Sequence, residues 1–188
     1  GGNRLSLTDS VNGVTTYTYN DNDWLLSEIA SSVTTNYTYD NNGNNLTKIS
    51  PNEQVIYEWN QENRLIGAEI TNSLGTTNLG YQYDANGVRV ASTVNGDETR
   101  YLVDVNREHV EVIEEYTSDG TTKVSYVHSW NLISANRDEE IDYYINDGHS
   151  GVRQLTDENG AVTDSYNYDG YGNLLDSSGD TENRYLYR

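Results

Sequence analysis

The sequence predicts an all-β protein, an array of antiparallel β-hairpin repeats that forms a spiral, a strip or a segment of a shell. Three observations favour this fold: aromatic pairs recur along the chain, similar turn residues follow most of them, and no segment has the periodicity and caps of a helix. The composition agrees, because 17 Tyr stand beside Val, Thr and Ile, residues that suit a pleated sheet, while Phe, Met and Cys are absent.

Each aromatic pair consists of two rings separated by one residue. In a strand, residues i and i+2 point to the same face, so a pair places its two rings side by side on one surface of the sheet. On a helix, the same two residues would not face each other. We therefore expect the rings of neighbouring hairpins to pack against one another as a ladder. The pairs are Tyr17/Tyr19, Tyr37/Tyr39, Tyr57/Trp59, Tyr81/Tyr83, Tyr166/Tyr168 and Tyr185/Tyr187.

Turn residues follow the first five pairs at a fixed offset. The next position is Asn or Asp, and three residues further on stands Gly, Asn or Asp, residues that tolerate or supply a positive φ. The repeat turns that combine Asp with Gly are Asp40/Gly43, Asp84/Gly87 and Asp169/Gly172. Shorter, two-residue hairpin turns are indicated at Asn12-Gly13, Asn95-Gly96, Asp119-Gly120 and Asn159-Gly160.

Charge and composition exclude several classes of partner. The chain has 30 acidic and 11 basic residues, a net charge of -19, which repels phosphate backbones and anionic lipids, so nucleic acid is not expected as a partner. No apolar run is long enough to span a membrane. The absence of Cys excludes disulfides, thiol catalysis and thiolate metal sites.

No catalytic or metal-binding residues are expected, and no enzyme activity. Asp147, His149 and Ser150 are the residue types of a hydrolase triad, but neighbours in one turn cannot adopt the triad geometry. The histidines are well separated in the sequence, which argues against a zinc site. Clustered oxygen ligands at residues 20–23 and 40–45 leave Ca²⁺ open as an alternative to no cofactor, although neither cluster has the EF-hand spacing.

Two segments carry a resemblance to a known family. Residues 37–44, Tyr-Thr-Tyr-Asp-Asn-Asn-Gly-Asn, and residues 166–174, Tyr-Asn-Tyr-Asp-Gly-Tyr-Gly-Asn-Leu, resemble the YD repeat of the RHS family. That family includes bacterial RHS proteins, the B and C components of insecticidal toxin complexes, and the teneurins of animals.

A third segment, residues 143–157, resembles the RHS motif in which a Tyr pair and an Asp lead into a turn and a Leu-Thr-Asp strand. The matching residues that we single out are Tyr144, Asp147, Gly151 and Arg153. Family members usually have His where Ile145 and Gly148 stand here, and Gly-Ser in place of Ser150-Gly151. We therefore do not expect this chain to have the role that those histidines play in other family members.

The resemblance implies an architecture and a role. In such proteins, hairpins coil into a hollow shell around a C-terminal toxin, and an RHS core frees the toxin by aspartyl self-proteolysis. It implies YD-repeat hairpins over residues 1–101, a divergent β-hairpin connection over residues 102–142, and an RHS-core-like motif with terminal YD repeats over residues 143–188. The chain would be a shell wall, spacer or fibre body of a secreted or cell-surface bacterial protein.

The expected partners follow from the same resemblance. They are the rest of a longer YD-repeat chain or other copies of this chain, and an enclosed toxin or a surface glycan. Residues 2–5 are in register with residues 43–46, and Tyr185/Tyr187 match the strand that begins a repeat. Each of these two half-repeats would leave an edge strand, to which another copy of the chain could bind and so form a filament.

Two alternative functions stay open. The chain could be a cell-surface adhesin or a glycan-binding module, because exposed aromatic residues can stack on sugars. It could also be a fragment of an RHS core self-protease that lacks its cleavage segment, since the Asp-Pro-x-Gly segment of that family does not occur in the sequence.

Overall fold

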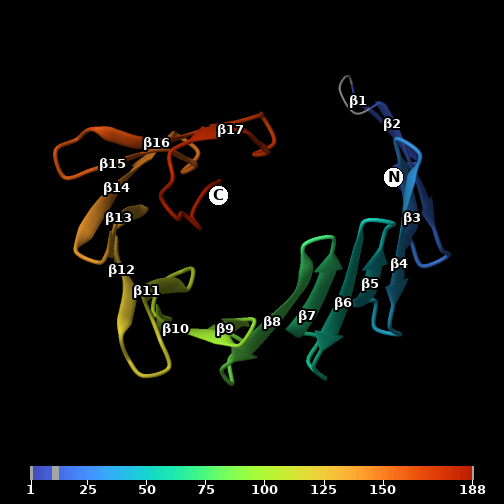
Figure 1. Ribbon diagram of the computed structural model, residues 1–188, viewed down its shortest axis with the longest axis horizontal. Helices are drawn as coiled ribbons and strands as arrows, with labels where there is room; N and C mark the ends of the chain where they lie inside the picture. Colours follow the sequence, from blue (N-terminus) through green and yellow to red (C-terminus); the bar gives the residue numbers. More distant parts are fainter. Residues whose placement is uncertain (1, 10–12, 188) are drawn as a thin grey trace. The chain divides into compact units, whose positions relative to one another are not determined.

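The computed structural model describes residues 2–9 and 13–187, and this described part consists of 17 β-strands joined by turns (Figure 1). Each strand is hydrogen-bonded to the strand that follows it in the sequence, and the pairing is that of an antiparallel meander. This confirms the predicted all-β array of hairpins. None of the described residues forms a helix that is long and apolar enough to cross a membrane.

The strands fall into two compact units, Gly1–Glu98 and Thr99–Arg188, with the boundary inside β10. The first unit contains β1 Ser6–Asp9, β2 Gly13–Tyr19, β3 Leu25–Ala30, β4 Val33–Tyr39, β5 Asn45–Ile49, β6 Glu53–Trp59, β7 Leu65–Asn72, β8 Gly75–Tyr83 and β9 Arg89–Val94. The second unit follows with β10 Asp97–Asp104, β11 Glu111–Tyr116, β12 Thr122–His128, β13 Leu132–Arg137, β14 Glu140–Asn146, β15 Val152–Thr156, β16 Val162–Tyr168 and β17 Leu174–Ser178.

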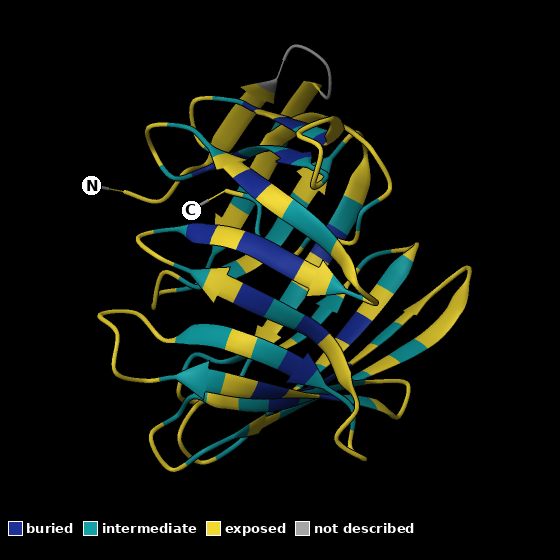
Figure 2. Ribbon diagram, turned by 90° about the vertical axis from the view of Figure 1, so that its left-hand side faces the viewer, coloured by how far each residue is buried: buried dark blue, intermediate teal, exposed yellow. Residues whose placement is uncertain are grey.

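The strands alternate between a covered face and an exposed face, as Figure 2 shows by the bands of colour along them. In β4, Thr35, Tyr37 and Tyr39 are buried or half-buried, while Asn36 and Thr38 between them are exposed. Because side chains two residues apart share a face, the Tyr-x-Tyr spacing places both rings on the covered side.

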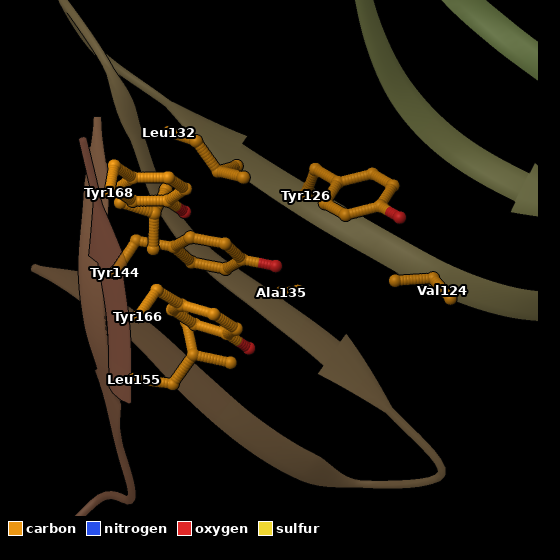
Figure 3. Close-up of a cluster of buried hydrophobic side chains, with 9 residues drawn as sticks. Val124, Tyr126, Leu132, Ala135, Tyr144, Leu155, Tyr166 and Tyr168 are labelled. Carbon is orange, nitrogen blue, oxygen red and sulfur yellow. The ribbon is translucent and has the colours of Figure 1, made fainter. Parts of the chain in front are cut away.

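The second unit has the denser core (Figure 3). Side chains of β12 to β16 converge on one side of the sheet, which we call the tyrosine face because it carries Tyr126, Tyr144, Tyr166 and Tyr168. The whole cluster comprises Val124, Tyr126, Leu132, Ala135, Tyr144, Val152, Leu155, Tyr166 and Tyr168. Among the described residues of the first unit, the buried apolar ones are fewer and smaller: Val55, Ala68 and Ala91.

The C-terminal segment, residues 179–187, differs from the expectation. The sequence indicates an aromatic strand at Tyr185/Tyr187, but these residues form no strand. The chain leaves β17 and crosses the tyrosine face, as the trace near the C label in Figure 1 shows, and the Val152 N–H donates to the Leu186 carbonyl at 2.8 Å. The physical reason is burial: on this face the two rings cover apolar surface that an edge strand would leave in water.

Candidate functional site

One five-residue turn recurs along the described chain, and the first of its residues organises it. In the turn at residues 40–44, the Asp40 N–H donates to the Asn44 carbonyl at 3.0 Å, and the Gly43 N–H donates back to the Asp40 carbonyl at 3.2 Å. One carboxylate oxygen of Asp40 also accepts the N–H groups of Asn42 and Asn44, at 2.8 and 2.9 Å. Turns with this backbone pattern start at Asn20, Asp40, Asn60, Asp84, Thr117, Asp147, Asp157 and Asp169.

The fourth residue of the turn needs a positive φ, which explains the residue types found there. Gly43 has a φ of 90° and Gly87 one of 84°, values that glycine adopts without steric cost. Asp23 and Asn63 take the same position with φ of 63° and 58°, in the left-handed region that short polar side chains tolerate. The structure thus places Asp40/Gly43, Asp84/Gly87 and Asp169/Gly172 at the first and fourth positions of the turn.

Hydrogen bonds inside the turn stabilise the charged form of its carboxylate. The Asn44 side chain, helped by the N–H groups of the turn, lowers the pKa of Asp40 below its usual 3.8. The Asn173 side chain has the same effect on the pKa of Asp169. These carboxylates act as acceptors that hold the chain reversal, which is the turn role expected for the acidic clusters.

The two-residue turns are only partly as expected. Asn95-Gly96 has a positive φ at both residues, as such a turn requires. The prediction is wrong for Asp119-Gly120 and Asn159-Gly160, because Gly120 and Gly160 are the fourth residues of five-residue turns that start at Thr117 and Asp157. The signal that could have found them is an Asp or Thr three residues before the Gly. Asn12 of the Asn12-Gly13 pair lies outside the described residues.

Successive turns on one edge of the first unit contact each other through side chains. The Trp24 ring, from the fifth position of one turn, lies against Gly43 of the next, so that a Cβ on Gly43 would be 3.2 Å from the ring. The Arg64 guanidinium lies in the same way against Gly87, where a Cβ would be 2.6 Å away. A Cβ at Gly43 or Gly87 would therefore require the Trp24 ring or the Arg64 guanidinium to shift, in addition to the strain of a positive φ.

An amide takes the place of the ring or guanidinium at two other steps. Asn44, at the fifth position, donates from Nδ2 to the Asn63 Oδ1 of the next turn at 2.8 Å. Asn3 donates from Nδ2 to the Asp23 Oδ1 at 2.7 Å. Asn3, which is in register with Asn44, thus makes the same kind of contact as Asn44 does.

The second aromatic residue of each pair in the first unit donates a hydrogen bond to a backbone carbonyl at the start of the preceding strand or, for Tyr19, just before it. Tyr39 Oη donates to the Leu25 carbonyl at 2.9 Å, and Trp59 Nε1 donates to the Asn45 carbonyl at 2.7 Å. Tyr19 and Tyr83 donate likewise to the carbonyls of Arg4 and Leu65. The position thus uses an N–H or O–H donor, which Tyr and Trp have and Phe lacks, and the sequence contains no Phe.

The ring contacts differ from the expected ladder of tyrosines. The ring recorded beside Tyr39 is that of Trp24, with centroids 5.3 Å apart. Tyr37 donates from its hydroxyl to Glu28 at 2.8 Å, and burial, reinforced by that carboxylate, raises the pKa of Tyr37 well above its usual 10.0. Tyr17, Tyr57 and Tyr81 are half-buried. The hairpins of this unit are therefore linked more by hydroxyl–carbonyl bonds than by stacked tyrosine rings.

A pair of conservative substitutions tests that conclusion. Tyr83→Phe should lower the free energy of unfolding by about 1 kcal/mol, because it deletes the bond to the Leu65 carbonyl but keeps the ring. Tyr168→Phe should cost nothing or stabilise, because the buried Tyr168 hydroxyl has no hydrogen-bond partner among the described residues. Denaturant titration gives both values, and equal losses for the two variants would contradict the assignment.

In the second unit, the RHS-like motif forms one of the five-residue turns and fixes an arginine. Asp147 accepts the N–H groups of His149 and Gly151 on one oxygen and Arg153 Nε on the other, the last at 2.7 Å. These bonds, with that of His149 first, lower the pKa of Asp147 below its usual 3.8. The Arg153 guanidinium then lies over the Tyr168 ring, 5.2 Å from its centroid, a cation–π arrangement.

Tyr187 occupies the space that a turn side chain fills in the first unit. Gly151 is the fifth residue of its turn and has no side chain to lie against Gly172, the fourth residue of the next turn on that edge. The Tyr187 ring lies there instead: a Cβ would be 3.1 Å from it on Gly151 and 2.4 Å from it on Gly172. The same ring is 5.2 Å from that of Tyr168. Residues far apart in the sequence thus complete the contact between two turns.

Tyr185 anchors the C-terminal segment on the tyrosine face. Its ring meets those of Tyr126 and Tyr144 edge-on, at 5.2 and 6.5 Å, and lies 6.4 Å from His128. Burial raises the pKa of Tyr185 to about 12. Such edge-to-face pairs add about 0.5–1.5 kcal/mol each to the burial of apolar area.

Polar contacts hold the same segment at three further points. Asp164, almost fully buried, accepts the Thr181 N–H at 3.0 Å and the Thr181 hydroxyl at 2.7 Å. Tyr144 donates to Asn183 Oδ1 at 3.2 Å. Glu115, also buried, accepts the Tyr126 hydroxyl at 2.8 Å and lies 3.5 Å from Arg184. These partners were not identified from the sequence.

The residues weighed for chemistry are not arranged as a triad. The Asp147 carboxylate accepts the backbone N–H groups of the turn and Arg153 Nε, so it serves as a turn residue and an arginine partner. Ser150 belongs to the same turn, with its N–H donating to the Asp147 carbonyl at 3.0 Å. Within residues 2–9 and 13–187, no group of three or more His, Asp or Glu side chains could hold a metal ion.

Comparisons by sequence relate the chain to bacterial nucleases. No protein-family model matches it. Over 112 residues, it is 31% identical to the tRNA3(Ser)-specific nuclease WapA of Bacillus spizizenii and 29% identical to the tRNA nuclease WapA of Bacillus subtilis. Each match covers 57% of this chain and 5% of the nuclease, so the chain spans a small part of those proteins.

This comparison corrects one expectation. The prediction that the chain is not an enzyme is contradicted, because the curated relatives that it matches are named as tRNA nucleases. Their names describe whole proteins of which this chain matches 5%. Reasoning from the composition and turn residues of a repeat segment could not have detected an activity named for those whole proteins.

Comparison with solved structures relates the fold to part of TcdB2-TccC3. The structure of TcdB2-TccC3-TEV matches with a TM-score of 0.56 and 18% identity, over 90% of this chain and 11% of that chain. TcdB2-TccC3-Cdc42 matches with a TM-score of 0.55 and 17% identity, over 87% of this chain and 11% of that chain. The chain is thus similar in fold to TcdB2-TccC3 and in sequence to part of the WapA nucleases.

Proposed function

We propose that the chain is a structural RHS/YD-repeat segment of a longer secreted or cell-surface protein, in which it acts as a shell wall, spacer or fibre body. The observation that carries this proposal is the regular contact between hairpins. In the first unit, fifth-position side chains contact the next turn, and the second aromatic of each pair bonds to the preceding strand. Contacts of this kind extend a wall by adding more of the same unit.

The nuclease relatives refine the proposal. The activity in their names belongs to proteins of which this segment corresponds to 5%. We therefore propose that the longer protein carries a toxin or nuclease part and that this segment supports or encloses it. Within the segment, residues 1–101 would serve as YD-repeat hairpins and residues 102–142 as a divergent β-hairpin connection. Residues 143–188 would carry the RHS-core-like motif and the terminal YD repeats.

The native product tests the proposal. Mass spectrometry of the protein from its producing cells should find these peptides in a species much larger than 21.2 kDa, in the medium or on the cell surface. The larger species should also yield peptides that follow residue 188. A product of 21.2 kDa confined to the cytoplasm would overturn both the wall role and the secretion.

A further inference from the structure

An open cavity of about 420 Å³ lies at one edge of the second unit. The three connections β10–β11, β12–β13 and β14–β15 form it, and they share an edge because alternate connections of a meander do. Its size falls within the range of roughly 300–1,000 Å³ that is typical of small-molecule sites. The lining residues are Arg107, Glu108, His109, Glu111, Ser129, Trp130, Asn131, His149 and Ser150.

Trp130 is the unusual residue of this cavity. Its side chain is 89% exposed, although the indole is the largest apolar surface that a residue can bury. The other Trp residues are half-buried and engaged: Trp59 donates to the Asn45 carbonyl, and Trp24 lies beside Tyr39. Trp130 therefore offers a flat apolar face to whatever enters the cavity.

The arginine of the cavity is already paired. Arg107 Nε lies 3.4 Å from Asp104 and 3.5 Å from Glu111, and its Nη1 donates to the Ser129 carbonyl at 3.2 Å. An anionic ligand would have to compete with these two carboxylates for the guanidinium. It would also approach a chain whose net charge is -19. The cavity is thus unsuited to phosphates and to acidic sugars.

Several other lining residues have side chains that donate or accept hydrogen bonds. Asn131 offers an amide, Ser129 and Ser150 offer hydroxyls, and His109 and His149 offer imidazoles, all of which donate or accept. A flat aromatic face surrounded by such groups suits a molecule with an apolar face and a rim of hydroxyls. A neutral pyranose sugar has this character.

We propose that this cavity, the Trp130 cavity, is a binding site for a neutral saccharide, with one sugar ring stacked on Trp130 and its hydroxyls bonded to the polar lining. The volume suits a mono- or disaccharide. The inference goes beyond the structural role and does not depend on it, since a wall segment without saccharide affinity would still satisfy the tests of that role.

Calorimetric titration of the whole chain with neutral disaccharides tests the site, using cellobiose, maltose, lactose and chitobiose as probes. At least one should bind, and Trp130→Ala should weaken its affinity by about tenfold or more, the loss expected for an aromatic stacking contact. Trp130→Phe should recover part of the affinity. Tyr171→Ala is the matched control, because Tyr171 is 92% exposed in the same unit but does not line the cavity. The Tyr171→Ala variant should bind the disaccharide as tightly as the unmodified chain does.

Three results would overturn the proposal. The first is the absence of binding to every probe by the unmodified chain. The second is binding that Trp130→Ala leaves unchanged or that Tyr171→Ala weakens equally, since the stacking residue would then be misassigned. The third is a preference for sialyllactose over lactose, because an acidic sugar should be repelled by the charge of this chain.

Discussion

Replacing Tyr126 by Ala is expected to lower the free energy of unfolding of the second unit by about 3–5 kcal/mol, the usual cost of removing a buried aromatic side chain. Tyr126 is 5% exposed, and its ring meets that of Tyr185 at 5.2 Å. The substitution also removes the hydroxyl that donates to the buried Glu115. Burial raises the pKa of Tyr126 well above its usual 10.0, so the hydroxyl remains a donor at neutral pH.

Denaturant unfolding followed by circular dichroism measures this effect, and two further variants locate it. Tyr126→Phe keeps the ring and should cost about 1–3 kcal/mol, because it leaves Glu115 with one partner fewer. Tyr39→Ala should cost less than Tyr126→Ala, because Tyr39 is only half-buried. If Tyr126→Ala proved as mild as Tyr39→Ala, the tyrosine face would not be the main core of its unit.

The hairpins could be predicted from the sequence because their signals are local. A Tyr-x-Tyr spacing defines one face of a strand, and an Asp with a Gly three residues later defines the turn. Asp40 follows Tyr39 directly and Gly43 stands three residues later, so the aromatic pair and the turn are encoded within seven residues, 37–43. Such signals do not depend on what the rest of the chain does.

The turns at Thr117 and Asp157 show where the local signal fails. Neither follows an aromatic pair, and the Asp119-Gly120 and Asn159-Gly160 dipeptides fit a two-residue hairpin equally well by composition. The side chain that accepts the turn N–H groups decides between them. The side chains of Thr117 and Asp157 accept a turn N–H group, and both residues stand three positions before the Gly. The dipeptide alone does not show that such an acceptor is present.

The course of residues 179–187 could not be predicted for a different reason. Tyr185 and Tyr187 have the spacing of a strand, and the sequence gives no sign that they bind elsewhere. Their position depends on features of other segments: the open tyrosine face and the absence of a side chain at Gly151. The Trp130 cavity is non-local in the same way, since three separate connections build it.

Gly172→Ala should lower the free energy of unfolding by more than any ordinary glycine substitution in these turns. The backbone there has a φ of 86°, which costs an L-residue roughly 1–2 kcal/mol. The new Cβ would also lie 2.4 Å from Tyr187 Cδ1, so the ring has to leave its place between the two turns. Displacement of a packed group adds about 1–3 kcal/mol. Denaturant titration measures the total.

The chain offers a matched control in Gly160, because it has the same turn position and a φ of 78°, but a Cβ there meets nothing within 4 Å. Gly160→Ala should therefore show the backbone cost alone. In a Tyr187→Ala background, the extra cost of Gly172→Ala should disappear, since the ring that it displaces is gone. Equal costs at Gly172 and Gly160 would mean that Tyr187 does not hold the two turns together. An excess that vanishes with the ring would show that a residue of the C-terminal segment replaces the side chain that Gly151 lacks.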